Sequence, residues 1–591
     1  MPLRSGNSTP APAKNAGHAG EQAREVEWQL AATDLGPVRQ WLGRHSVLDG
    51  LRIEPLPAQQ LHDTYLDTAD WRVFRAGYAL RMREKGGHAE ATLKGLHSAR
   101  DDVADRRELT EPLTEGGARA LAQATGPVGS RVRDVIGVKP LRRLFGVRTS
   151  RERFAVRSRE SAEEVGELAL DEAQFSRRNG HRRPIVLARV ELEAVGSNTA
   201  PLERLVARLR TECGLQPATQ NKFAAGLHSA SLEPPRTGEP DQKAERVRAA
   251  MDAASRAGDF AAAALHRLID EWRVHEPAAR LGESPEALHA LRVTGRRMDT
   301  VLSLFRDHLP SAVGKSRPKL KSLLDALGAA RDVDIRLEAA NTFHGELPES
   351  DRRALDPLLR HLESERSAAR TNMLRALDAK PTRHWLERLT TQLARPTPET
   401  PSASPPGAAA LSVVPDLIRK RYRKLRKCAR RLTRESSMSQ YHAVRVRTKK
   451  LRYALEIAAP TYAQPADEML AALHKLQSRL GVQHDSDVVA RYVMQLAARP
   501  PSEFSPQTLF LMGRMTELHT RKAARMGGKV EKPWRKLRGK RWKGLRTRME
   551  ELRDDVSQSN STDDGTGHLA EGGGELATAT GDSASAAATR S

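Results

Sequence analysis

Two pairs of glutamates with one residue between them lie at opposite ends of residues 25–193. They are Glu25 with Glu27, and Glu191 with Glu193. Because residues i and i+2 of a β-strand point to the same face, each pair would present two carboxylates together. Neighbouring carboxylates repel each other unless a cation lies between them, and their oxygens suit a hard divalent ion such as Mg²⁺ or Mn²⁺. The spacing therefore indicates a candidate metal site.

Basic residues occupy similar alternating positions between the two glutamate pairs. They are Arg81 with Arg83, then Lys94, and then Arg106 with Glu108. Charges of both signs on one face of several strands would suit a sheet closed into a barrel with a wet, charged interior. The alternative is that these side chains lie on the solvent face of antiparallel strands and form cross-strand ion pairs. The residues alone leave both interpretations open.

A second charged motif occurs twice in the later part of the chain. The two copies are HALRVTGRR at 289–297 and HAVRVRTKK at 442–450, which are offset by 153 positions. The segments LGAARDVD at 327–334 and LGVQHDSD at 480–487 follow them at the same offset of 153. Two motifs that share one offset indicate an internal duplication.

The repeated motif would place cations along one side of a helix. Positions i, i+3 and i+7 share a helix face, which aligns His289, Arg292 and Arg296 in the first copy. Such a stripe must meet solvent, carboxylates or a bound anion, and arginine matches phosphate oxygens bidentately. The aspartates of the following segment could hold these cations or join a metal site, and we favour the first role. A single motif would indicate an ordinary solvated helix face, but the duplication favours an anion-binding surface.

The elements that carry these two constellations differ in periodicity. Between residues 25 and 200, short runs alternate polar and apolar residues, as in YALRMR at 78–83, and these predict strands. Helices are expected at Leu35–His45 and Pro201–Cys213, whereas residues 241–550 have a helical period nearly throughout. The predicted fold class is α+β multidomain, with an N-terminal antiparallel β-barrel tunnel and a C-terminal all-α duplicated helical bundle.

Charge and composition divide the chain along the same line. Residues 21–230 hold 33 basic and 29 acidic residues, a net of +4, whereas residues 241–550 hold 60 and 35, a net of +25. Proline- and glycine-containing breaks fall at 231–240 and at 395–410. The expected organisation is a disordered 1–20, a strand domain over 21–230, a linker at 231–240, a helical domain over 241–550 with repeats at about 241–394 and 411–550, and a disordered acidic tail at 551–591.

The composition argues against several functional classes. Cys213 and Cys428 are too few for a disulfide framework, no stretch reaches the roughly 20 apolar residues of a membrane span, and residues 1–20 lack the apolar core of a secretory signal. A cytoplasmic protein without membrane contact is therefore expected. The net charge of +24 suits a polyanionic partner, but aromatic residues make up only 4%, which argues against base stacking and a nucleic-acid partner.

The strand region resembles the CYTH family, the triphosphate tunnel metalloenzymes. The resemblance covers about residues 21–230 and runs in the family's order. It rests on Glu25-x-Glu27, YLDT at 65–68, ALRMR at 79–83, TLK at 92–94, Arg106-x-Glu108, Arg148 and Arg151, LDE at 170–172, Glu191-x-Glu193 and NKF at 221–223. Members of the family form an eight-stranded antiparallel tunnel that binds a triphosphate group with inward cations and divalent metal ions.

The resemblance implies roles for individual residues. The expected metal ligands are Glu25, Glu27, Asp171, Glu191 and Glu193, with Mg²⁺ or Mn²⁺ as the ion. The expected substrate-binding cations are Arg81, Arg83, Lys94, Arg106, Arg151 and Lys222. Lys222 is also expected to be catalytic, as is Glu108, which would be an orienting carboxylate.

Three positions depart from the family's pattern. Gln29 stands where the opening motif has a lysine, Arg189 stands where the final strand often has a glutamate, and Asn221 replaces the serine before Lys222. Gln29 removes a cation that would help to position the substrate or the attacking water. Arg189 could subtract a metal ligand or simply face outward. These departures bear on turnover more than on fold or phosphate binding.

The helical region resembles the CHAD family, the conserved histidine α-helical domain, over about residues 241–550. Both halves carry the family's histidine-arginine helix and its LG-to-aspartate segment. CHAD domains are associated with inorganic polyphosphate, which implies a polyphosphate-binding set of His289, Arg292, Arg296, Arg297, His442, Arg445, Lys449, Lys450 and Arg452. One departure is His484 at the position equivalent to Arg331, where the cation becomes pH-dependent.

Together the two resemblances predict a phosphoanhydride hydrolase of the inorganic triphosphatase type. The tunnel would hydrolyse inorganic triphosphate or a related triphosphate with a divalent metal, and the basic helices would bind polyphosphate. The alternative is a non-catalytic protein that binds polyphosphate or associates with polyphosphate granules, and Gln29 favours it. The sequence sets neither the chain-length preference nor the oligomeric state.

Overall fold

The computed structural model describes residues 24–96, 103–176, 185–196, 198–235, 256–393, 408–433 and 435–563. The side chains of residues 24, 25, 103–106, 185 and 556–563 are not among those described. The predicted disordered segment at 1–20 and part of the predicted linker at 231–240 lie outside these ranges. The chain divides into two compact units, of which the first comprises residues 1–245, 263–396 and 485–521, and the second residues 246–262, 397–484 and 522–591.

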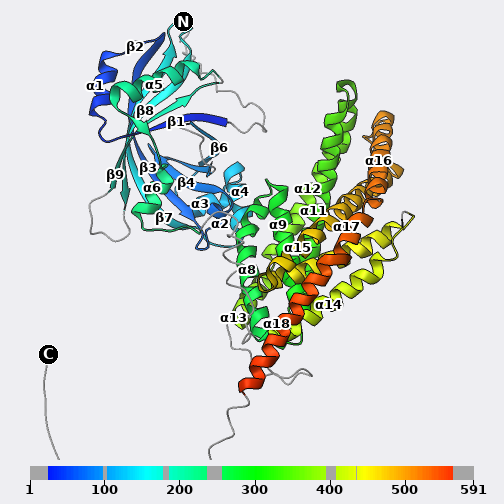
Figure 1. The fold of residues 1–591 in the computed structure, drawn as a ribbon. Helices are drawn as coiled ribbons and strands as arrows, with labels where there is room; N and C mark the ends of the chain where they lie inside the picture. The colour runs from blue at the N-terminus through cyan, green and yellow to red at the C-terminus, as the bar shows by residue number, and fades with distance from the viewer. Residues whose placement is uncertain are drawn as a thin grey trace, which may run out of the picture. The chain divides into compact units, whose positions relative to one another are not determined.

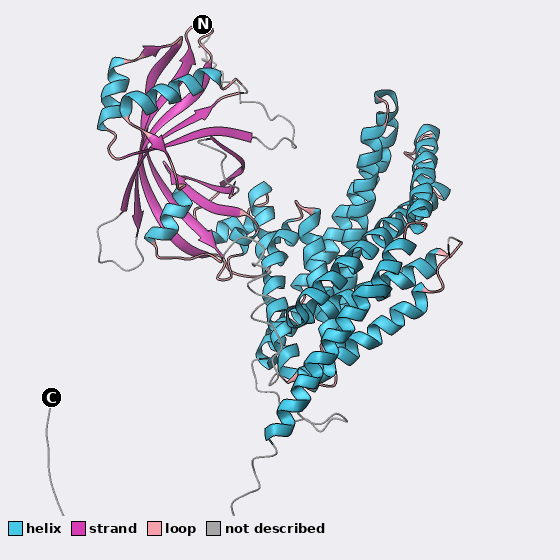
Figure 2. Cartoon of the chain, viewed as in Figure 1, coloured by secondary structure: helices cyan, strands magenta, loops and turns pink. Residues whose placement is uncertain are grey.

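The first part of the chain forms an antiparallel sheet domain (Figures 1 and 2). Its long strands are β1 (Arg24–Ala32), β3 (Leu51–Asp67), β4 (Tyr78–Lys85), β5 (His88–Gly95), β6 (Val103–Leu113), β7 (Arg142–Ser158), β8 (Glu164–Ser176) and β9 (Ile185–Ala194), and β2 (Val47–Leu48) and β10 (Gln216–Pro217) are short. The order of pairing is β1-β6-β5-β4-β3-β7-β8-β9, and β9 pairs with β1. Residues 24–28 of β1 pair with β6 and residues 27–32 pair with β9, so the path of pairings returns to its first strand. The predicted antiparallel, tunnel-like domain is confirmed.

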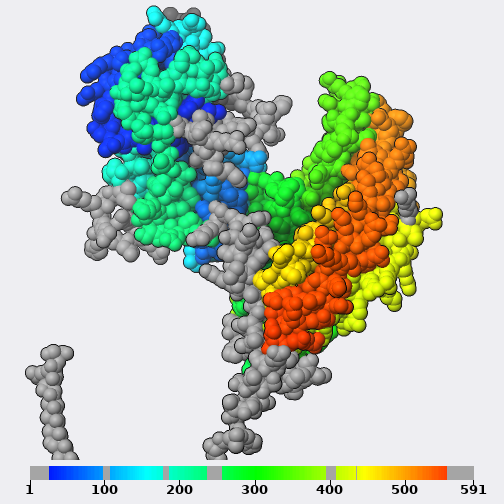
Figure 3. All heavy atoms as spheres, in the orientation of Figure 1, coloured from blue at the N-terminus to red at the C-terminus, as the bar shows by residue number. Residues whose placement is uncertain are grey.

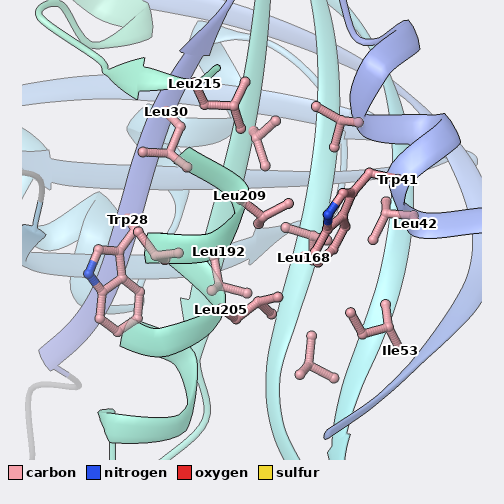
Figure 4. Packing of buried hydrophobic residues seen from close by; sticks show 14 of the residues in the cluster. Trp28, Leu30, Trp41, Leu42, Ile53, Leu168, Leu192, Leu205, Leu209 and Leu215 are labelled. Carbon is pink, nitrogen blue, oxygen red and sulfur yellow. The ribbon is translucent and has the colours of Figure 1, made fainter. Parts of the chain in front are cut away.

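The outer face of the sheet carries a hydrophobic core, which Figure 4 shows. Trp28 and Leu30 of β1 and Leu192 of β9 pack there with side chains of α1 (Gly36–Arg44) and α5 (Ala200–Cys213). Both helices match the ranges predicted from the sequence. Because strand residues alternate between faces, burial of residues 28, 30 and 192 against helices turns residues 27, 29, 191 and 193 to the inner face. The core therefore sets which charged side chains face inward.

The remaining helices of the sheet domain are short. They are α2 (Arg72–Arg75), α3 (Ala118–Gln123), α4 (Pro127–Ile136) and α6 (Lys222–Ser229). A second core cluster includes Leu80, Leu93 and Val132, which places α4 against β4 and β5. Apolar packing thus covers the outer face of the sheet, whereas the inner face carries charged side chains together with an apolar cluster that includes Tyr65, Phe145 and Phe223.

The described residues from 256 onward are almost entirely helical (Figure 2). The helices are α8 (Ala257–Leu281), α9 (Pro285–Leu304), α10 (Ser311–Gly314), α11 (Arg317–Glu346), α12 (Glu349–Asp378), α13 (Lys380–Leu393), α14 (Ala410–Ala429), α15 (Met438–Ala498), α16 (Pro506–Gly527), α17 (Glu531–Lys536), the π-helical turn η1 (Leu537–Arg541) and α18 (Trp542–Asp563). This confirms the predicted all-α region. α18 continues to Asp563, so the predicted disordered tail at 551–591 is wrong as far as that residue.

In the first unit, α9 packs closely against neighbouring helices. A Cβ atom on Gly295 would lie 2.7 Å from Leu324 Cδ2 and 2.9 Å from Trp272 Cζ3, so only glycine fits between α8 and α11 at this approach. A separate apolar cluster joins α11, α12 and α16 through residues such as Phe343, Leu358 and Met512. Apolar packing thus holds α9 with its charged side away from the core.

The second unit contains α14 and α18, which lie side by side in Figures 1 and 3. Tyr422 of α14 stacks on Trp542 of α18, with ring centroids 3.6 Å apart and an interplanar angle of 9°. α15 is interrupted at Ala463, whose φ of 48° and ψ of −135° are not helical, between Pro460 and Pro465. The proline pair accounts for the break, because each lacks an amide donor and crowds the preceding turn.

Candidate functional site

A buried group of four charges lies on the inner face of β7, β8 and β9. Arg151 and Asp171 are cross-strand partners, with Arg151 Nε 2.7 Å from Asp171 Oδ1 and Nη2 2.7 Å from Oδ2. Arg151 Nη2 also lies 2.5 Å from Glu191 Oε2. Lys222 donates to Asp171, and its Nζ lies 2.9 Å from Glu191 Oε1. Two cations and two carboxylates therefore share one site, as expected for inward-facing charges.

Helix α6 positions Lys222 at this group. The Asn221 side chain caps the helix by accepting from the Ala224 amide at 2.8 Å, so asparagine serves at the position of the family's serine. Phe223 packs among Tyr65 and Phe145, with ring centroids 5.6 and 6.0 Å away. A Cβ atom on Gly226 would lie 2.0 Å from the Phe145 ring, so glycine permits this contact. The apolar anchor fixes the helix while Lys222 reaches the carboxylates.

The electrostatics of this group hold Glu191 ionised. Burial alone would raise the pKa of Glu191, since only 8% of the residue is exposed. The positive charges of Lys222, Arg151 and Arg189 outweigh burial and keep its pKa well below the ordinary value. The negative charges of Glu191 and Asp171 raise the pKa of Arg151, although burial opposes this. Glu191 and Arg151 thus each stabilise the charged form of the other.

A second group of charges lies on β1, β4, β5 and β6. Lys94 Nζ lies 2.8 Å from Glu108 Oε2 and 3.4 Å from Glu27 Oε2, and Arg81 Nη2 lies 3.6 Å from Glu108 Oε1. Lys94 and Glu108 are directly opposite across the β5–β6 pair. Although burial opposes it, the charges of Glu27 and Glu108 raise the pKa of Lys94. The structure therefore brings together Arg81, Lys94, Glu108 and Glu27.

Arg83 has a carboxylate partner that the sequence analysis missed. Its Nε and Nη2 lie 2.7 and 2.9 Å from the two oxygens of Asp63, its cross-strand neighbour on β3. Burial would raise the pKa of Asp63, but the hydrogen bonds from Arg83 and the charges of Arg81 and Lys222 lower it. The sequence contained a signal for Asp63, because this residue lies two positions before Tyr65 of the YLDT motif and therefore shares its strand face.

The carboxylates of Glu27 and Glu193 are the described pair that best suits a divalent ion. The two residues lie directly opposite each other on β1 and β9. Desolvation and the charge of Glu27 raise the pKa of Glu193, and the charge of Lys94, which also contacts Glu27, opposes this shift. Among the described residues, no group of three or more acidic, histidine or cysteine side chains is arranged to hold a metal ion. Glu27 and Glu193 could supply two ligands, whereas Asp171 and Glu191 already pair with Arg151 and Lys222.

Gln29 and Arg189, the two departures from the family pattern, contact each other. Arg189 faces inward, with 1% of its surface exposed, and its Nη1 donates to Gln29 Oε1 at 3.2 Å. Its Nη2 donates to the backbone carbonyl of Gln220, just before α6. The alternative that Arg189 faces outward is therefore wrong.

The side chains of two predicted tunnel residues, Glu25 and Arg106, are not among those that the structure describes. Glu25 of β1 is opposite Arg106 of β6 in the backbone register. Their roles as a metal ligand and a substrate-binding cation therefore stay predictions.

The first copy of the repeated motif lies on α9. His289 is exposed, and Arg292 and Arg296 are partly exposed. Arg292 Nη1 lies 3.6 Å from Asp332 Oδ1 of α11, and Arg297 Nη1 lies 2.9 Å from Glu271 Oε1 of α8. α9 thus presents a histidine and cations beside one another, with neighbouring helices supplying carboxylates that orient them.

Comparison with known protein families identifies both parts of the chain. Residues 39–226 match the CYTH domain model, and residues 263–494 match the CHAD domain model. The chain carries a CYTH domain followed by a CHAD domain. The order agrees with the motifs found in the sequence, and the matched ranges are shorter than the 21–230 and 241–550 of the two resemblances.

Several solved structures are similar in fold to parts of the chain. The CHAD domain from the plant Ricinus communis is 24% identical, with a TM-score of 0.42, covering 49% of this chain and 95% of that one. PptA from Streptomyces chartreusis is 22% identical, with a TM-score of 0.38, covering 48% and 100%. HpAC1 from Hippeastrum, named as an adenylyl cyclase and described as having a dominant triphosphatase activity, is 18% identical, with a TM-score of 0.28, covering 35% and 96%. No curated protein sequence matches the chain.

The second copy of the CHAD motif lies on α15. His442 is exposed, Arg445 and Lys449 are partly exposed, and Lys450 is exposed. The rings of His442 and His484 lie 5.0 Å apart, which brings the two ends of the repeat unit together. This copy therefore presents two imidazoles where the first has one imidazole and Arg331.

Arg452 is placed differently from the other predicted polyphosphate-binding residues. It is 6% exposed, its Nη1 lies 3.2 Å from Glu456 Oε1, and its guanidinium stacks on the Tyr453 ring at 4.6 Å. An arginine held in this way offers little of its charge to a surface ligand. Arg452 instead stabilises its own helix.

The aspartates of the repeat hold cations, as we favoured over a metal role. Asp332 contacts Arg292, Asp334 accepts from Arg366 Nε at 3.1 Å, and Asp487 lies 2.5 Å from Arg491. Only the first of these contacts involves the motif's own cation stripe.

Within the described part of the chain, no helix has the length and apolar character to cross a membrane.

Proposed function

We propose that the CYTH domain hydrolyses inorganic triphosphate, or a related triphosphate, with a divalent metal ion, and that the CHAD domain binds polyphosphate. The observation that carries the proposal is the inward set of Arg81, Arg83, Lys94, Arg151 and Lys222, each oriented by a carboxylate. A triphosphate carries several negative charges in a short chain, and such a set of prepositioned cations complements it.

The cations would bind and orient the phosphate chain. Arg83 and Arg151 present planar donor groups that match two phosphate oxygens at once, whereas Lys94 and Lys222 act as point charges. Because their carboxylate partners already fix these side chains, little reorganisation is needed when the substrate binds. Glu108, held between Arg81 and Lys94, orients this end of the site.

Glu27 and Glu193 are the residues that would hold the metal. A bound Mg²⁺ or Mn²⁺ would polarise phosphoryl oxygens and orient the attacking water. The family resemblance adds Glu25, Asp171 and Glu191 to the proposed metal ligands. In the structure, Asp171 and Glu191 hold Arg151 and Lys222 in place.

The test is metal-dependent phosphate release from tripolyphosphate. We expect release with Mg²⁺ or Mn²⁺ and a loss of roughly 100-fold or more for Glu191→Ala combined with Glu193→Ala. Glu152→Ala with Glu172→Ala is the matched control, because these partly exposed glutamates pair with Arg39 of α1. No metal-dependent release by the unsubstituted chain would contradict the enzymatic proposal.

A non-catalytic polyphosphate-binding role, at polyphosphate granules in the cytoplasm, is the second candidate. It is favoured by Gln29, which leaves β1 without a cation at that position, and by the absence of a three-ligand metal group among the described side chains. Tripolyphosphate binding without turnover at any metal concentration would favour this role over hydrolysis.

A further inference from the structure

Arg189 is a buried cation that differs from the other cations of the tunnel. Arg83, Lys94, Arg151 and Lys222 each form an ion pair with a carboxylate. Arg189 is 1% exposed, yet no ion pair to it is found among the described residues. Burial of a charge without a direct ion pair is unfavourable, so a function for this charge is implied.

The surroundings of Arg189 place it in the phosphate site. It lies directly opposite Asp171 across the β8–β9 pair and shares a strand face with Glu191. Asp171 is also the register partner of Arg151 across the β7–β8 pair, and it accepts a hydrogen bond from Lys222. Arg189 therefore lies at the same end of the tunnel as Lys222 and Arg151.

Two neutral partners hold the guanidinium and leave a donor unused. Nη1 donates to Gln29 Oε1 and Nη2 to the Gln220 carbonyl, whereas the buried Nε has no hydrogen-bond partner. A buried N–H group without an acceptor is rare in folded proteins and is commonly completed by a ligand or water. A phosphate oxygen would complete both the charge and the hydrogen bonding.

We propose that Arg189 is a further substrate-binding residue of the tunnel, which contacts the phosphate chain beside Lys222 and supplies from β9 the positive charge that Gln29 does not supply from β1. This inference rests on the proposed function of the CYTH domain. Gln29 then has a defined role, because its amide oxygen orients the guanidinium without neutralising it. The two departures form one compensating pair.

The test is calorimetric binding of tripolyphosphate to the full chain in EDTA, which removes turnover and metal from the readout. All variants are made in a chain that carries Arg292→Glu and Arg445→Glu, so that binding to the CHAD surface is reduced. We expect Arg189→Gln to weaken binding roughly 10- to 100-fold, as for loss of a charged hydrogen bond. Arg39→Gln is the matched control, because Arg39 pairs with Glu152 and Glu172 on the helix-covered face of the sheet. The affinity of this variant for tripolyphosphate should equal that of the parent chain.

A second variant separates charge from structural support. Adding Gln29→Lys to Arg189→Gln returns one positive charge to the same place from β1, and we expect it to recover most of the affinity. If Arg189 only stabilised the fold through its hydrogen bond to the Gln220 carbonyl, Gln29→Lys would not recover the affinity. Where Arg189→Gln does not fold, Arg189→Lys is used, and a loss of at least about threefold is expected because lysine lacks the planar fork.

The outcomes distinguish this inference from the proposed function. The role of Arg189 alone would be overturned if folded Arg189→Gln, or Arg189→Lys, bound tripolyphosphate as tightly as the chain with Arg189 intact. It would also be overturned if Gln29→Lys did not recover binding. No tripolyphosphate binding in EDTA by the chain with Arg189 intact would overturn this inference, whereas the proposed function is overturned only when metal-dependent phosphate release is also absent.

Discussion

At the scale of single residues, the tunnel is organised by pairs of opposite charges on neighbouring strands. Asp63 with Arg83, Lys94 with Glu108, and Arg151 with Asp171 are each register partners. Such pairs cost desolvation, which close geometry and multiple hydrogen bonds must offset. Their value for binding is that each cation is fixed before the substrate arrives.

Asp63→Asn should destabilise the CYTH domain. The substitution leaves Arg83 buried without its counter-charge, and we expect a loss of about 3 kcal/mol in the free energy of unfolding. Denaturant unfolding at pH 7 measures it. Asp49→Asn, at an exposed position, is the control and should change stability little.

The same pair sets a pH dependence. The pKa of Asp63 is lowered in the folded state, so its contribution is present above the unfolded value of 3.8 and is lost as pH falls through the lower folded value. The stability difference between the unsubstituted chain and Asp63→Asn should therefore shrink below about pH 4. A difference that stays constant from pH 7 to pH 3 would contradict this.

At the scale of elements, α6 joins the apolar core to the charged site. Gly226→Ala would place a methyl group 2.0 Å from the Phe145 ring, so α6 must move and carry Lys222 with it. We expect a loss of about 1–3 kcal/mol in stability, together with a fall in kcat/KM for tripolyphosphate. Gly43→Ala in α1, where the added atom meets nothing within 4 Å, should affect neither.

The α9 and α15 motifs make a separate prediction. Arg292→Glu with Arg445→Glu should weaken long-chain polyphosphate binding at least 10-fold at low salt, because two phosphate-facing cations become anions. Filter binding of labelled polyphosphate measures it. Arg306→Glu with Lys475→Glu is the control of equal charge change at exposed positions outside the motif. Equal losses from both pairs would show that only net charge matters.

Periodicity predicted the elements well where one face is apolar. The alternation at 78–83 became β4, and the predicted helices at 35–45 and 201–213 became α1 and α5. The break at Ala463 was not predicted, because the helical pattern continues across Pro460 and Pro465. The end of α18 was also missed, since residues 557–563 are polar and carry no apolar stripe.

The candidate site was predictable in its membership but not in its pairings. The inward cations were found through the family motifs, whereas Asp63, Arg189 and the cap by Asn221 needed the register of the strands and the position of α6. A sequence gives which residues alternate, but it does not give which strand lies opposite. The direction of Arg189 was open for this reason.

At the scale of the whole molecule, charge is used in two ways. The CYTH region is nearly balanced, and most of the inward charges described above are paired and at least partly buried, whereas the excess of basic residues lies in the helical region. Exposed charges are screened by salt over about 10 Å at 0.1 M, and buried charges much less. The two regions should therefore respond differently to ionic strength.

Raising NaCl from 50 to 300 mM should weaken long-chain polyphosphate binding at least 10-fold while changing KM for tripolyphosphate only a few-fold. The first is measured by binding to the full chain and the second by steady-state phosphate release. Parallel salt dependences would indicate that both ligands use the same exposed surface, contrary to this division.

The central claim is that the inward charges of the CYTH domain act on a triphosphate, and the initial rate of phosphate release from tripolyphosphate tests it most directly. The rate is compared with Mg²⁺ and with EDTA for the unsubstituted chain, Lys222→Gln and Arg39→Gln. We predict metal-dependent release, a loss of roughly 100-fold or more in kcat/KM for Lys222→Gln, and no change for Arg39→Gln. Equal rates for Lys222→Gln and the unsubstituted chain, or no metal-dependent release, would contradict the account.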